Sequence, residues 1–141
     1  MKLKIEVSIH EIDALVEKLT NFPRRELLQI IANKSAEQVE RRIFEEKTTP
    51  GGARWESWSP RYAKTRKGGN SLLYGTGALL QSITGQVLDD KQAVVSSNLP
   101  YAARQHFGGG GIPARPYMGL SQDNIDEING VVEAWLQSYL K

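Results

Sequence analysis

Few side chains in the sequence are of types that could carry out chemistry. Histidine occurs twice, as His10 and His106, and neither stands in an HxH or HExxH metal-binding pattern. The adjacent carboxylates Asp89 and Asp90 are of the type used in acid–base catalysis, although neighbouring acids at a hairpin tip are typical of a solvated turn. A hydrolase would therefore require His106 to meet Asp89 or Asp90 in the folded chain.

Other catalytic patterns are weaker. Ser57 and Ser82 lack the GxSxG context of a nucleophile elbow. The run Gly108–Gly111 is not followed by Lys-Ser or Lys-Thr, so it does not resemble a phosphate-binding loop. The chain has no cysteine, which excludes disulfides, thiolate nucleophiles and cysteine metal sites and fits a reducing compartment. We therefore expect a protein that is not an enzyme, with no cofactor-binding or metal-binding residues.

Two irregular segments carry the residue types that anchor protein interfaces. The first is Thr48–Asn70, a Gly-, Pro- and Ser-rich basic stretch that contains Trp55, Trp58 and Tyr62. Long loops without apolar periodicity are usually functional or disordered, and Trp, Tyr and Arg dominate interface hot spots. The sequence leaves two interpretations of the tryptophans open: lids that fold back over the core, or contacts to a partner.

The second segment lies within Pro100–Pro116, which reads PYAARQHFGGGGIPARP. A short helix-like piece, Tyr101–Phe107, precedes the four glycines, and prolines then stiffen the chain. We predict a shaped loop over 108–115 that contacts a partner together with the first segment. The expected interface residues are Trp55, Trp58, Tyr62, Arg66, Tyr101, His106, Phe107, Arg115 and Tyr117. A local role is the alternative, in which Arg115 bonds loop carbonyls and the tyrosines pack under the glycines.

The elements that must position these loops are clear in the first half of the chain. Lys2–Val7 alternates apolar and polar residues and predicts a half-buried strand. An amphipathic helix is predicted over Ile9–Thr20 and a longer one over Arg24–Glu46, with Pro23 in the first turn of the latter. The long helix would span about 33 Å. Its expected buried face is Leu27, Leu28, Ile31, Ala32, Ala36, Val39 and Ile43.

The second half predicts shorter elements. Thr76 is placed as the cap of a short helix that runs through Ile83 and ends at Gly85. A β-hairpin is expected from Gln86–Leu88 and Ala93–Ser96, and Tyr117–Leu120 could pair as an edge strand. A last helix follows a Ser121 cap, with acids in its first turn. Its expected apolar stripe is Ile125, Ile128, Val131, Val132, Trp135, Leu136 and Tyr139.

Composition and element order set the fold class. The chain has 141 residues, 40% hydrophobic and 24% charged, which predicts one globular domain over 1–141. No apolar run reaches the roughly 20 residues that a membrane helix needs, and the N-terminus lacks a signal-peptide core. Strands and helices do not alternate in βαβ units. We therefore predict an α+β fold: a small antiparallel sheet packed with several helices and carrying two long irregular loops.

Nucleic-acid binding is the main alternative to a protein interface. Between residues 50 and 70 the bases are Arg54, Arg61, Lys64, Arg66 and Lys67, and the only acid is Glu56. Basic side chains interleaved with aromatic ones suit contacts to phosphates and stacking on nucleobases. The net charge of only +2 and the acidic last helix argue against it. A basic loop and an acidic helix also suit head-to-tail packing of copies, which forms rings when the rotation closes.

Four segments together resemble the phage virion morphogenesis family, the tail-completion proteins of Mu-like and related tailed phages. They are a W-x-x-[LW]-S/P-x-x-Y segment, Trp55–Tyr62; an L-x-x-[ST]-G-x-L-x-x-S-I segment, Leu73–Ile83; a YA-x-x-H-x-FG-like segment, Tyr101–Gly108; and an IPARP-[FY]-x-G segment, Ile112–Gly119. In the third segment His106 stands directly beside Phe107 and Gly108. The resemblance implies a structural protein of tail completion or head–tail joining, without cofactor. Its implied partners are other phage head–tail or tail proteins. It implies a location in the virion, and in the host bacterial cytoplasm during assembly.

Overall fold

The computed structural model describes residues 17–65, 72–74 and 77–141. The predicted strand Lys2–Val7, most of the predicted helix Ile9–Thr20 and the predicted cap Thr76 lie outside this part of the chain. Residues 17–20 are helical, as expected for the end of that helix. No helix among the described residues is long and apolar enough to cross a membrane.

One long helix is the central element of the molecule. Helix α2 spans Arg24–Arg41 and continues without a break into a π-helical turn, η2, over Arg42–Glu46. Lys47 ends it in a left-handed conformation, with φ of 57°. The predicted helix over 24–46 is thus confirmed, and the seven residues of its predicted apolar face are all buried or half-buried.

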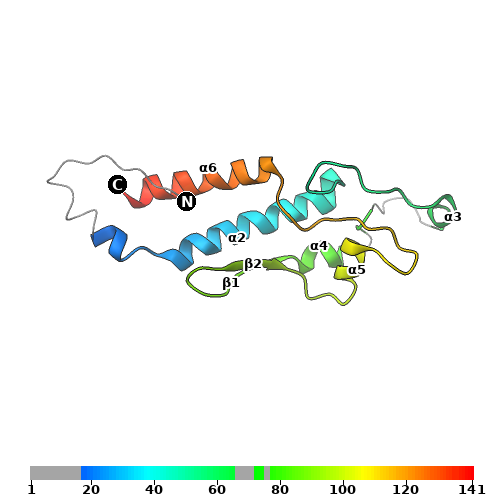
Figure 1. Cartoon of the computed structure of the whole chain (residues 1–141), viewed down its shortest axis with the longest axis horizontal. Coiled ribbons are helices and arrows are strands. Elements are labelled where there is room, and N and C mark those ends of the chain that lie inside the picture. Colours follow the sequence, from blue (N-terminus) through cyan, green and yellow to red (C-terminus); the bar gives the residue numbers. More distant parts are fainter. Residues whose placement is uncertain (1–16, 66–71, 75–76) are drawn as a thin grey trace.

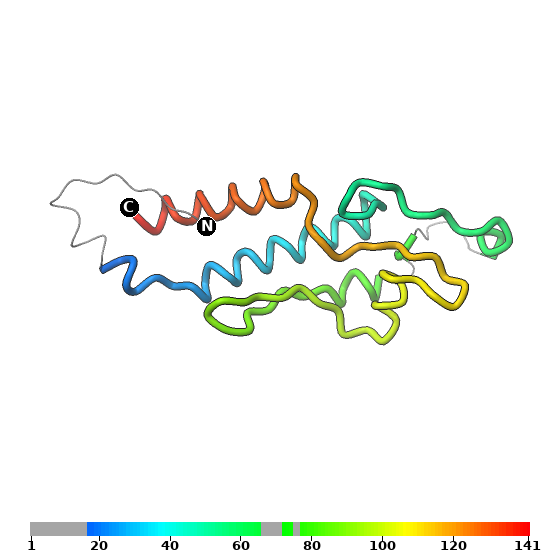
Figure 2. Tube along the Cα trace, viewed as in Figure 1, coloured from blue at the N-terminus to red at the C-terminus, as the bar shows by residue number. Residues whose placement is uncertain are grey.

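Helix α2 lies between two other elements that run along the same axis (Figures 1 and 2). On one side is helix α6, Gln122–Tyr139, which runs antiparallel to it. On the other side is an antiparallel hairpin of strands β1, Thr84–Val87, and β2, Ala93–Ser96. Shorter helices α3, Pro60–Ala63, α4, Ala78–Ser82, and α5, Ala102–Phe107, gather at one end of the elongated molecule. The small α+β fold is therefore confirmed.

Close packing of the hairpin against α2 depends on Gly85. A Cβ atom built on this residue would lie 2.6 Å from the backbone oxygen of Ala32. Gly85 was predicted to cap a helix, and this is wrong: α4 ends at Ser82, Ile83 is already extended, and Gly85 pairs with Val95 within the sheet. The glycine is needed for its small size in a strand that touches helix backbone.

The apolar core has two clusters joined by α2. One lies at the end of the molecule that carries the short helices, and its buried members are Ala36, Val39, Ile43, Trp55, Leu79, Ile83, Ala102 and Tyr117. The other seals the N-terminal half of α2 against α6, and its buried members are Leu27, Ile128, Val132 and Leu136. Phe22 extends the second cluster by packing edge-on against Trp135 and Tyr139.

Helix α6 begins where the sequence predicts. The Ser121 side chain accepts a hydrogen bond from the backbone N–H of Asn124, and the Asn124 side chain accepts one from Ser121 N–H, both at 3.0 Å. This reciprocal cap fixes the direction in which the chain enters the helix. Ile125 of the predicted stripe is 38% exposed, whereas Ile128, Val132 and Leu136 are buried.

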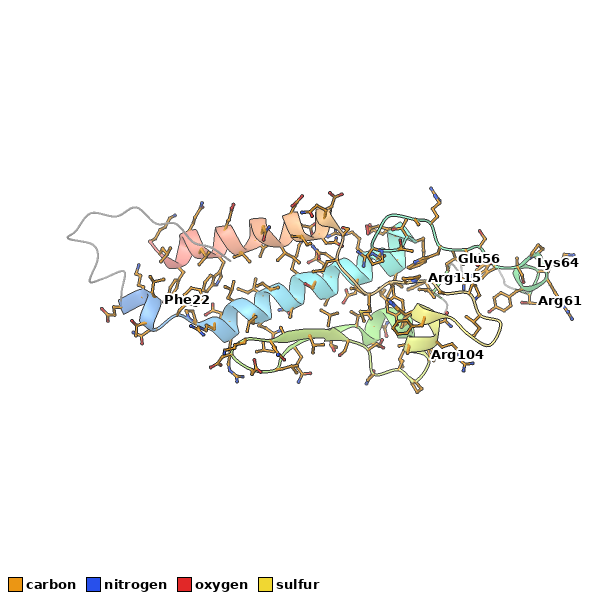
Figure 3. The ribbon with its side chains drawn as sticks, in the orientation of Figure 1. Phe22, Glu56, Arg61, Lys64, Arg104 and Arg115 are labelled. Carbon is orange, nitrogen blue, oxygen red and sulfur yellow. The ribbon has the colours of Figure 1, made fainter. Side chains whose placement is uncertain are left out.

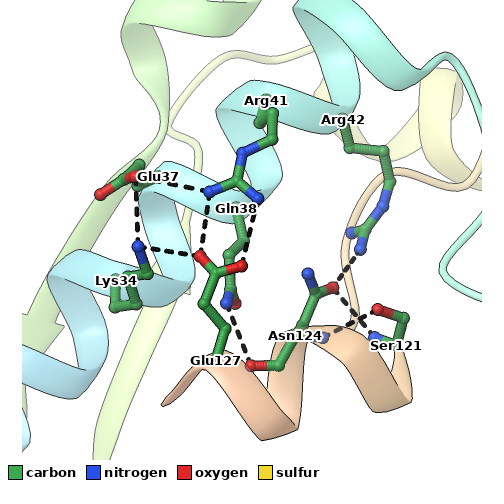
Figure 4. Close-up of polar contacts among 8 residues, drawn as sticks. All are labelled: Lys34, Glu37, Gln38, Arg41, Arg42, Ser121, Asn124 and Glu127. Carbon is green, nitrogen blue, oxygen red and sulfur yellow. Dashed lines mark hydrogen bonds and ion pairs between the residues drawn. The ribbon is translucent and has the colours of Figure 1, made fainter. Parts of the chain in front are cut away.

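Polar contacts join α2 to the first turns of α6 (Figure 4). The carboxylate of Glu127 receives hydrogen bonds from Arg41, at 3.0 and 3.3 Å, and pairs with Lys34 at 2.8 Å. The hydrogen bonds from Arg41 and then Lys34 hold the pKa of Glu127 at about 2, well below its ordinary value of 4.5. Glu127 therefore stays ionised and acts as a clasp between the two helices.

A second joint beside this clasp is buried. The guanidinium of Arg42, only 1% exposed, donates to the carbonyls of Tyr117 and Gly119 at 2.7 and 2.9 Å and to Asn124 Oδ1 at 2.5 Å. Desolvation lowers the pKa of Arg42 from its usual value. These three bonds use both Nη atoms of the guanidinium and tie the end of α2 to the segment that leads into α6.

Candidate partner-binding site

A pocket of about 670 Å³ opens where the two irregular loops meet, at the end of the molecule that carries α3, α4 and α5. Residues 56–59 and 62 form one wall, and the start of α4 with residues 73–74 forms another. The remaining lining comes from α5 and from residues 111–115 of the glycine loop. Four of the predicted interface residues line it: Trp58, Tyr62, Tyr101 and Arg115.

The predicted interface residues divide into exposed and internal groups. Tyr62, Tyr101 and Phe107 are exposed, with Phe107 reaching 77%, and Trp58 is half-buried. The internal group is Trp55, His106, Arg115 and Tyr117, of which His106 is half-buried and the others are buried. Arg66 lies outside the described residues. A role of any of these residues in partner contacts stays a prediction.

The internal group ties the two irregular loops together. Trp55 Nε1 donates to the carbonyl of Pro116 at 2.8 Å, and Arg115 Nε donates to the carbonyl of Glu56 at 2.9 Å. Each loop thus supplies a side chain that bonds the backbone of the other. The local role foreseen for Arg115, bonding of loop carbonyls, is present, and so is the lid-like burial of Trp55.

A second set of bonds roots the glycine loop on α5. The backbone N–H of Arg115 donates to the carbonyl of Gln105, and the Tyr117 hydroxyl donates to the carbonyl of Ala102 at 2.6 Å. His106 Nδ1 accepts from the backbone N–H groups of Tyr117 and Met118, each at 3.3 Å. Burial lowers the pKa of His106, which favours the neutral ring that this acceptor role requires.

These bonds also explain a wrong prediction. Tyr117–Leu120 was expected to pair as an edge strand, but the sheet in the described part of the chain contains only β1 and β2. The N–H groups of Tyr117 and Met118 bond a histidine side chain, and the carbonyls of Tyr117 and Gly119 accept from Arg42. Side chains have satisfied the backbone groups that a neighbouring strand would have bonded.

The glycine run forms a tight turn that needs its glycines. All four residues Gly108–Gly111 have positive φ, between 59° and 123°. Gly109 and Ile112 exchange backbone hydrogen bonds at 2.9 and 3.0 Å, and a Cβ on Gly108 would lie 2.7 Å from Ala114 N. The turn therefore folds back on itself and presents Ile112 and Pro113 to the pocket.

The opposite wall is held by a short helix. Ser59 caps α3 by accepting from the N–H of Tyr62 at 3.2 Å, and Pro60 occupies the first turn. This turn sets the ring of Tyr62 edge-on to Trp58, with 6.0 Å between the centroids. The two aromatic rings thereby line the pocket as a pair.

The described basic residues of the first loop, Arg54, Arg61 and Lys64, are exposed. Arg54 lies near the start of the loop, where it forms a β-bridge with Thr48, and Arg61 and Lys64 lie at the far tip, in and directly after α3 (Figure 3). Among the described residues no acidic side chain pairs with any of the three. Glu56 and Arg115 lie closer to the centre of the molecule, where the loops meet.

The contacts needed for a hydrolase are not brought together. Asp90 pairs with Arg25 at the start of α2, and Asp89 accepts from the N–H of Lys91 in the hairpin turn. His106 lies on α5, beyond the other end of the hairpin, and its Nδ1 faces backbone N–H groups. The described ranges also hold no cluster of three or more metal-ligating side chains.

Sequence reasoning missed several residues of the pocket and its supports. Gln105, Leu73, Tyr74, Ile112 and Pro113 all line the pocket. All five lie inside three of the four segments that carry the family resemblance, and this was the only sequence signal that could have pointed to them. It does not show which of their side chains face a common space. Gly119 was also missed as a support. Its φ is 136°, and an added Cβ would lie 2.8 Å from Pro50 Cγ.

Comparison with known proteins places this architecture in a family. The model of the phage virion morphogenesis family matches residues 7–137, which is most of the chain. The putative capsid assembly protein G of Escherichia phage Mu is 28% identical, in an alignment that covers 100% of this chain and 98% of that protein. The Mu-like prophage FluMu G protein 1 of Haemophilus influenzae is 26% identical over 77% of this chain and 76% of its own length. No solved structure matches the chain. The chain therefore belongs to the phage virion morphogenesis family.

Proposed function

We propose that this protein is a non-enzymatic structural component of a phage virion that acts in tail completion or head–tail joining. Family membership supports a role in virion assembly as such. The relative in phage Mu carries the name of a putative capsid assembly protein, which is consistent with a role on the head side of the joint. We further propose that the protein is part of the virion and assembles in the host bacterial cytoplasm.

The single observation that carries the proposal is the end of the molecule built from both irregular loops. Tyr62, Tyr101 and Phe107 leave aromatic surface exposed there, and the pocket lies beside them. Large aromatic side chains in a polar surround are the usual anchors of protein interfaces. The supporting bonds from Trp55, Arg115 and Tyr117 give this surface a fixed shape before any partner arrives.

The test is to delete the gene from the phage or prophage that encodes it and to image the lysate by electron microscopy. The proposed role requires filled heads and tails to accumulate as separate particles, and a plasmid copy of the gene to restore joined virions. An absence of heads would overturn tail completion and favour capsid assembly. Mass spectrometry of purified virions would check whether the protein stays in the particle.

Self-association is part of the same proposal. Helix α6 carries Asp123, Asp126, Glu127 and Glu133 and no basic residue, whereas the tip of the first loop is basic. Copies could therefore pack head to tail, with opposite charges in contact. Light scattering over a concentration series at low and moderate salt would show a discrete oligomer, and a strict monomer under all conditions would contradict ring formation in isolation.

Nucleic-acid binding is the second candidate, favoured by the exposed Arg54, Arg61 and Lys64, with which no acidic side chain of residues 17–65, 72–74 and 77–141 forms an ion pair. Phosphate contacts by these side chains would give an affinity for duplex DNA that falls steeply with salt. Replacement of all three by serine should then abolish binding, with exposed bases elsewhere, Arg24 and Lys91, as matched control sites. An absence of binding at low salt would remove this candidate.

A further inference from the structure

The guanidinium of Arg115 is almost enclosed, yet only part of it is bonded. The residue is 6% exposed and lines the pocket. Its Nε donates to the Glu56 carbonyl at 2.9 Å, and no hydrogen bond from either Nη atom is made to any of the described residues. Burial lowers the pKa of Arg115, and the carboxylate of Glu56 nearby offsets this effect only in part. The Glu56 and Arg115 side chains do not form an ion pair.

An arginine held in this way is prepared to bind an anion. Burial of a charge costs free energy unless a counter-charge or hydrogen-bond acceptors compensate it, and burial lowers the pKa of this group. The Nε bond to Glu56 and the backbone bond to Gln105 fix the plane of the fork without using its Nη atoms. A guanidinium fork matches the two oxygens of a carboxylate in a bidentate geometry.

The rest of the pocket lining suits a peptide side chain beside that carboxylate. Trp58, Tyr62 and Tyr101 supply aromatic surface, while Ile112 and Pro113 supply rigid aliphatic surface from the glycine turn. The volume of about 670 Å³ is in the range of sites that hold small ligands or a few side chains. Glu56 is the one acid in the described lining of the pocket, and its side chain is exposed. Exposed Arg61 and Lys64 lie farther out on the first loop and add positive charge near the pocket.

We propose that this pocket binds an extended segment of another virion protein, with an Asp or Glu carboxylate on Arg115 and a neighbouring apolar side chain between the aromatic walls. The inference rests on the proposed assembly function and names the chemistry of the partner. A nearly enclosed guanidinium among apolar walls favours a side-chain carboxylate as the ligand. The phosphate backbone of a nucleic acid is instead bound by exposed lysine and arginine side chains along an open groove.

The experiment is an NMR titration of the ¹⁵N-labelled full-length chain with a capped tripeptide, acetyl-Phe-Glu-Leu-amide. The matched control is the isosteric acetyl-Phe-Gln-Leu-amide, which keeps shape and removes the charge. We expect saturable shifts confined to the pocket residues, and binding of the glutamine peptide at least about tenfold weaker, since charge-assisted hydrogen bonds are stronger than neutral ones. The change is made in the peptide because Arg115 also holds the loops together.

One variant localises the binding. Tyr62→Ala removes an exposed pocket ring that the core does not use, and we expect it to weaken the glutamate peptide by about tenfold or more, as for an interface anchor. Leu88→Ala, an exposed apolar residue of the hairpin, is the control and should change nothing.

Three results would overturn the inference. They are equal binding of the two peptides, shifts outside the pocket, and no shifts at about 10 mM peptide, where even complexes weaker than about 1 mM are detected. Pocket shifts caused by oligothymidine but not by the peptides would assign the site to nucleic acid instead. None of these results bears on whether deletion of the gene leaves heads and tails unjoined, so the proposed function is judged separately.

Discussion

Trp55 Nε1 donates a hydrogen bond to the carbonyl of Pro116 across 61 residues of sequence, and this bond joins the two irregular loops that the sequence singles out. Together with the bond from Arg115 to Glu56, it makes one structure from two segments. The segments around Trp55 and Pro116 therefore support each other in the folded chain, in addition to any contact with a partner.

The two tryptophans of the first loop should differ in their effect on stability. Trp55→Phe removes the part-buried hydrogen bond to Pro116 and leaves a void beside a buried ring, and we expect a loss of about 1–3 kcal/mol in the free energy of unfolding. Trp58→Phe is the matched control at a half-buried pocket position and should cost less than about 1 kcal/mol. Urea unfolding followed by circular dichroism measures both, and equal losses would contradict the division into core and pocket residues.

Glycine-to-alanine changes should have opposite signs at two positions. Gly85→Ala would place a methyl group 2.6 Å from Ala32 O, a backbone atom of α2 that cannot rotate away as a side chain could, and we expect a loss of about 1–3 kcal/mol from overpacking. Gly130→Ala lies in α6 with open space around its Cβ and should raise stability by about 0.5–1 kcal/mol. Thermal and urea unfolding of the two variants decide the matter; a neutral Gly85→Ala would mean that the hairpin can move away from α2.

The Glu127 clasp should lose its contribution in acid. Because its pKa is lowered to about 2 in the folded chain, the ion pairs stabilise the fold fully above the ordinary value of 4.5. This contribution is lost as the pH falls from about 5 towards 2. The side chain is 34% exposed, so we expect Glu127→Gln to cost only about 0.5–1 kcal/mol at pH 7 and almost nothing at pH 2.

Unfolding curves at several pH values measure this effect. Glu133→Gln, on the exposed side of the same helix, is the control and should follow the parent chain throughout. A Glu127→Gln variant whose loss of stability stays constant between pH 7 and pH 2 would show that the ion pairs do not stabilise the fold.

The acceptor role of His106 predicts a second pH effect. Burial lowers its pKa, so the fold favours the neutral ring, and the associated stability is present above the unfolded value of about 6.5 and decreases as the pH falls below it. His106→Asn keeps an acceptor near the Nδ1 position without titrating. We expect a flatter dependence of unfolding free energy on pH below 6.5 in this variant.

His10 is present in both the parent chain and the His106→Asn variant, so it does not contribute to the difference between their pH profiles of unfolding free energy. The imidazole resonances of His106, followed by NMR as the pH is lowered, give an independent measure of the same protonation. Parallel pH profiles of the parent and the variant would mean that the ring does not serve as the acceptor for Tyr117 and Met118.

Local sequence signals predicted the elements whose causes are local. The long helix, the cap by Ser121, the second strand of the hairpin and the short helix before the glycines all follow from periodicity and capping residues within a few positions. The resemblance of the four segments to a family also proved correct.

The errors arose where distant residues decide. Gly85 has the position of a helix cap in the sequence, and only the approach of Ala32 shows why a strand needs it. Tyr117–Leu120 is extended in pattern, but His106 and Arg42 take the backbone groups that a strand partner would use. The candidate site shows the same limit, because sequence identified Trp58, Tyr62, Tyr101 and Arg115 without showing that they surround one pocket.

The two joints between α2 and α6, the buried one at Arg42 and the exposed one at Glu127, should respond differently to salt. The Arg42 side chain is only 1% exposed, and its bonds to the Tyr117 carbonyl and to Asn124 are buried, so mobile ions have little access to the charge. The Glu127 clasp faces solvent, where ions screen charges beyond about 8 Å at physiological strength and compete for closer ones. High salt should therefore weaken the contact between the helices at Glu127, while the buried joint at Arg42 stays intact. If the protein is part of the released virion, as proposed, the buried joint would keep the end that carries the pocket in register in dilute and in saline surroundings.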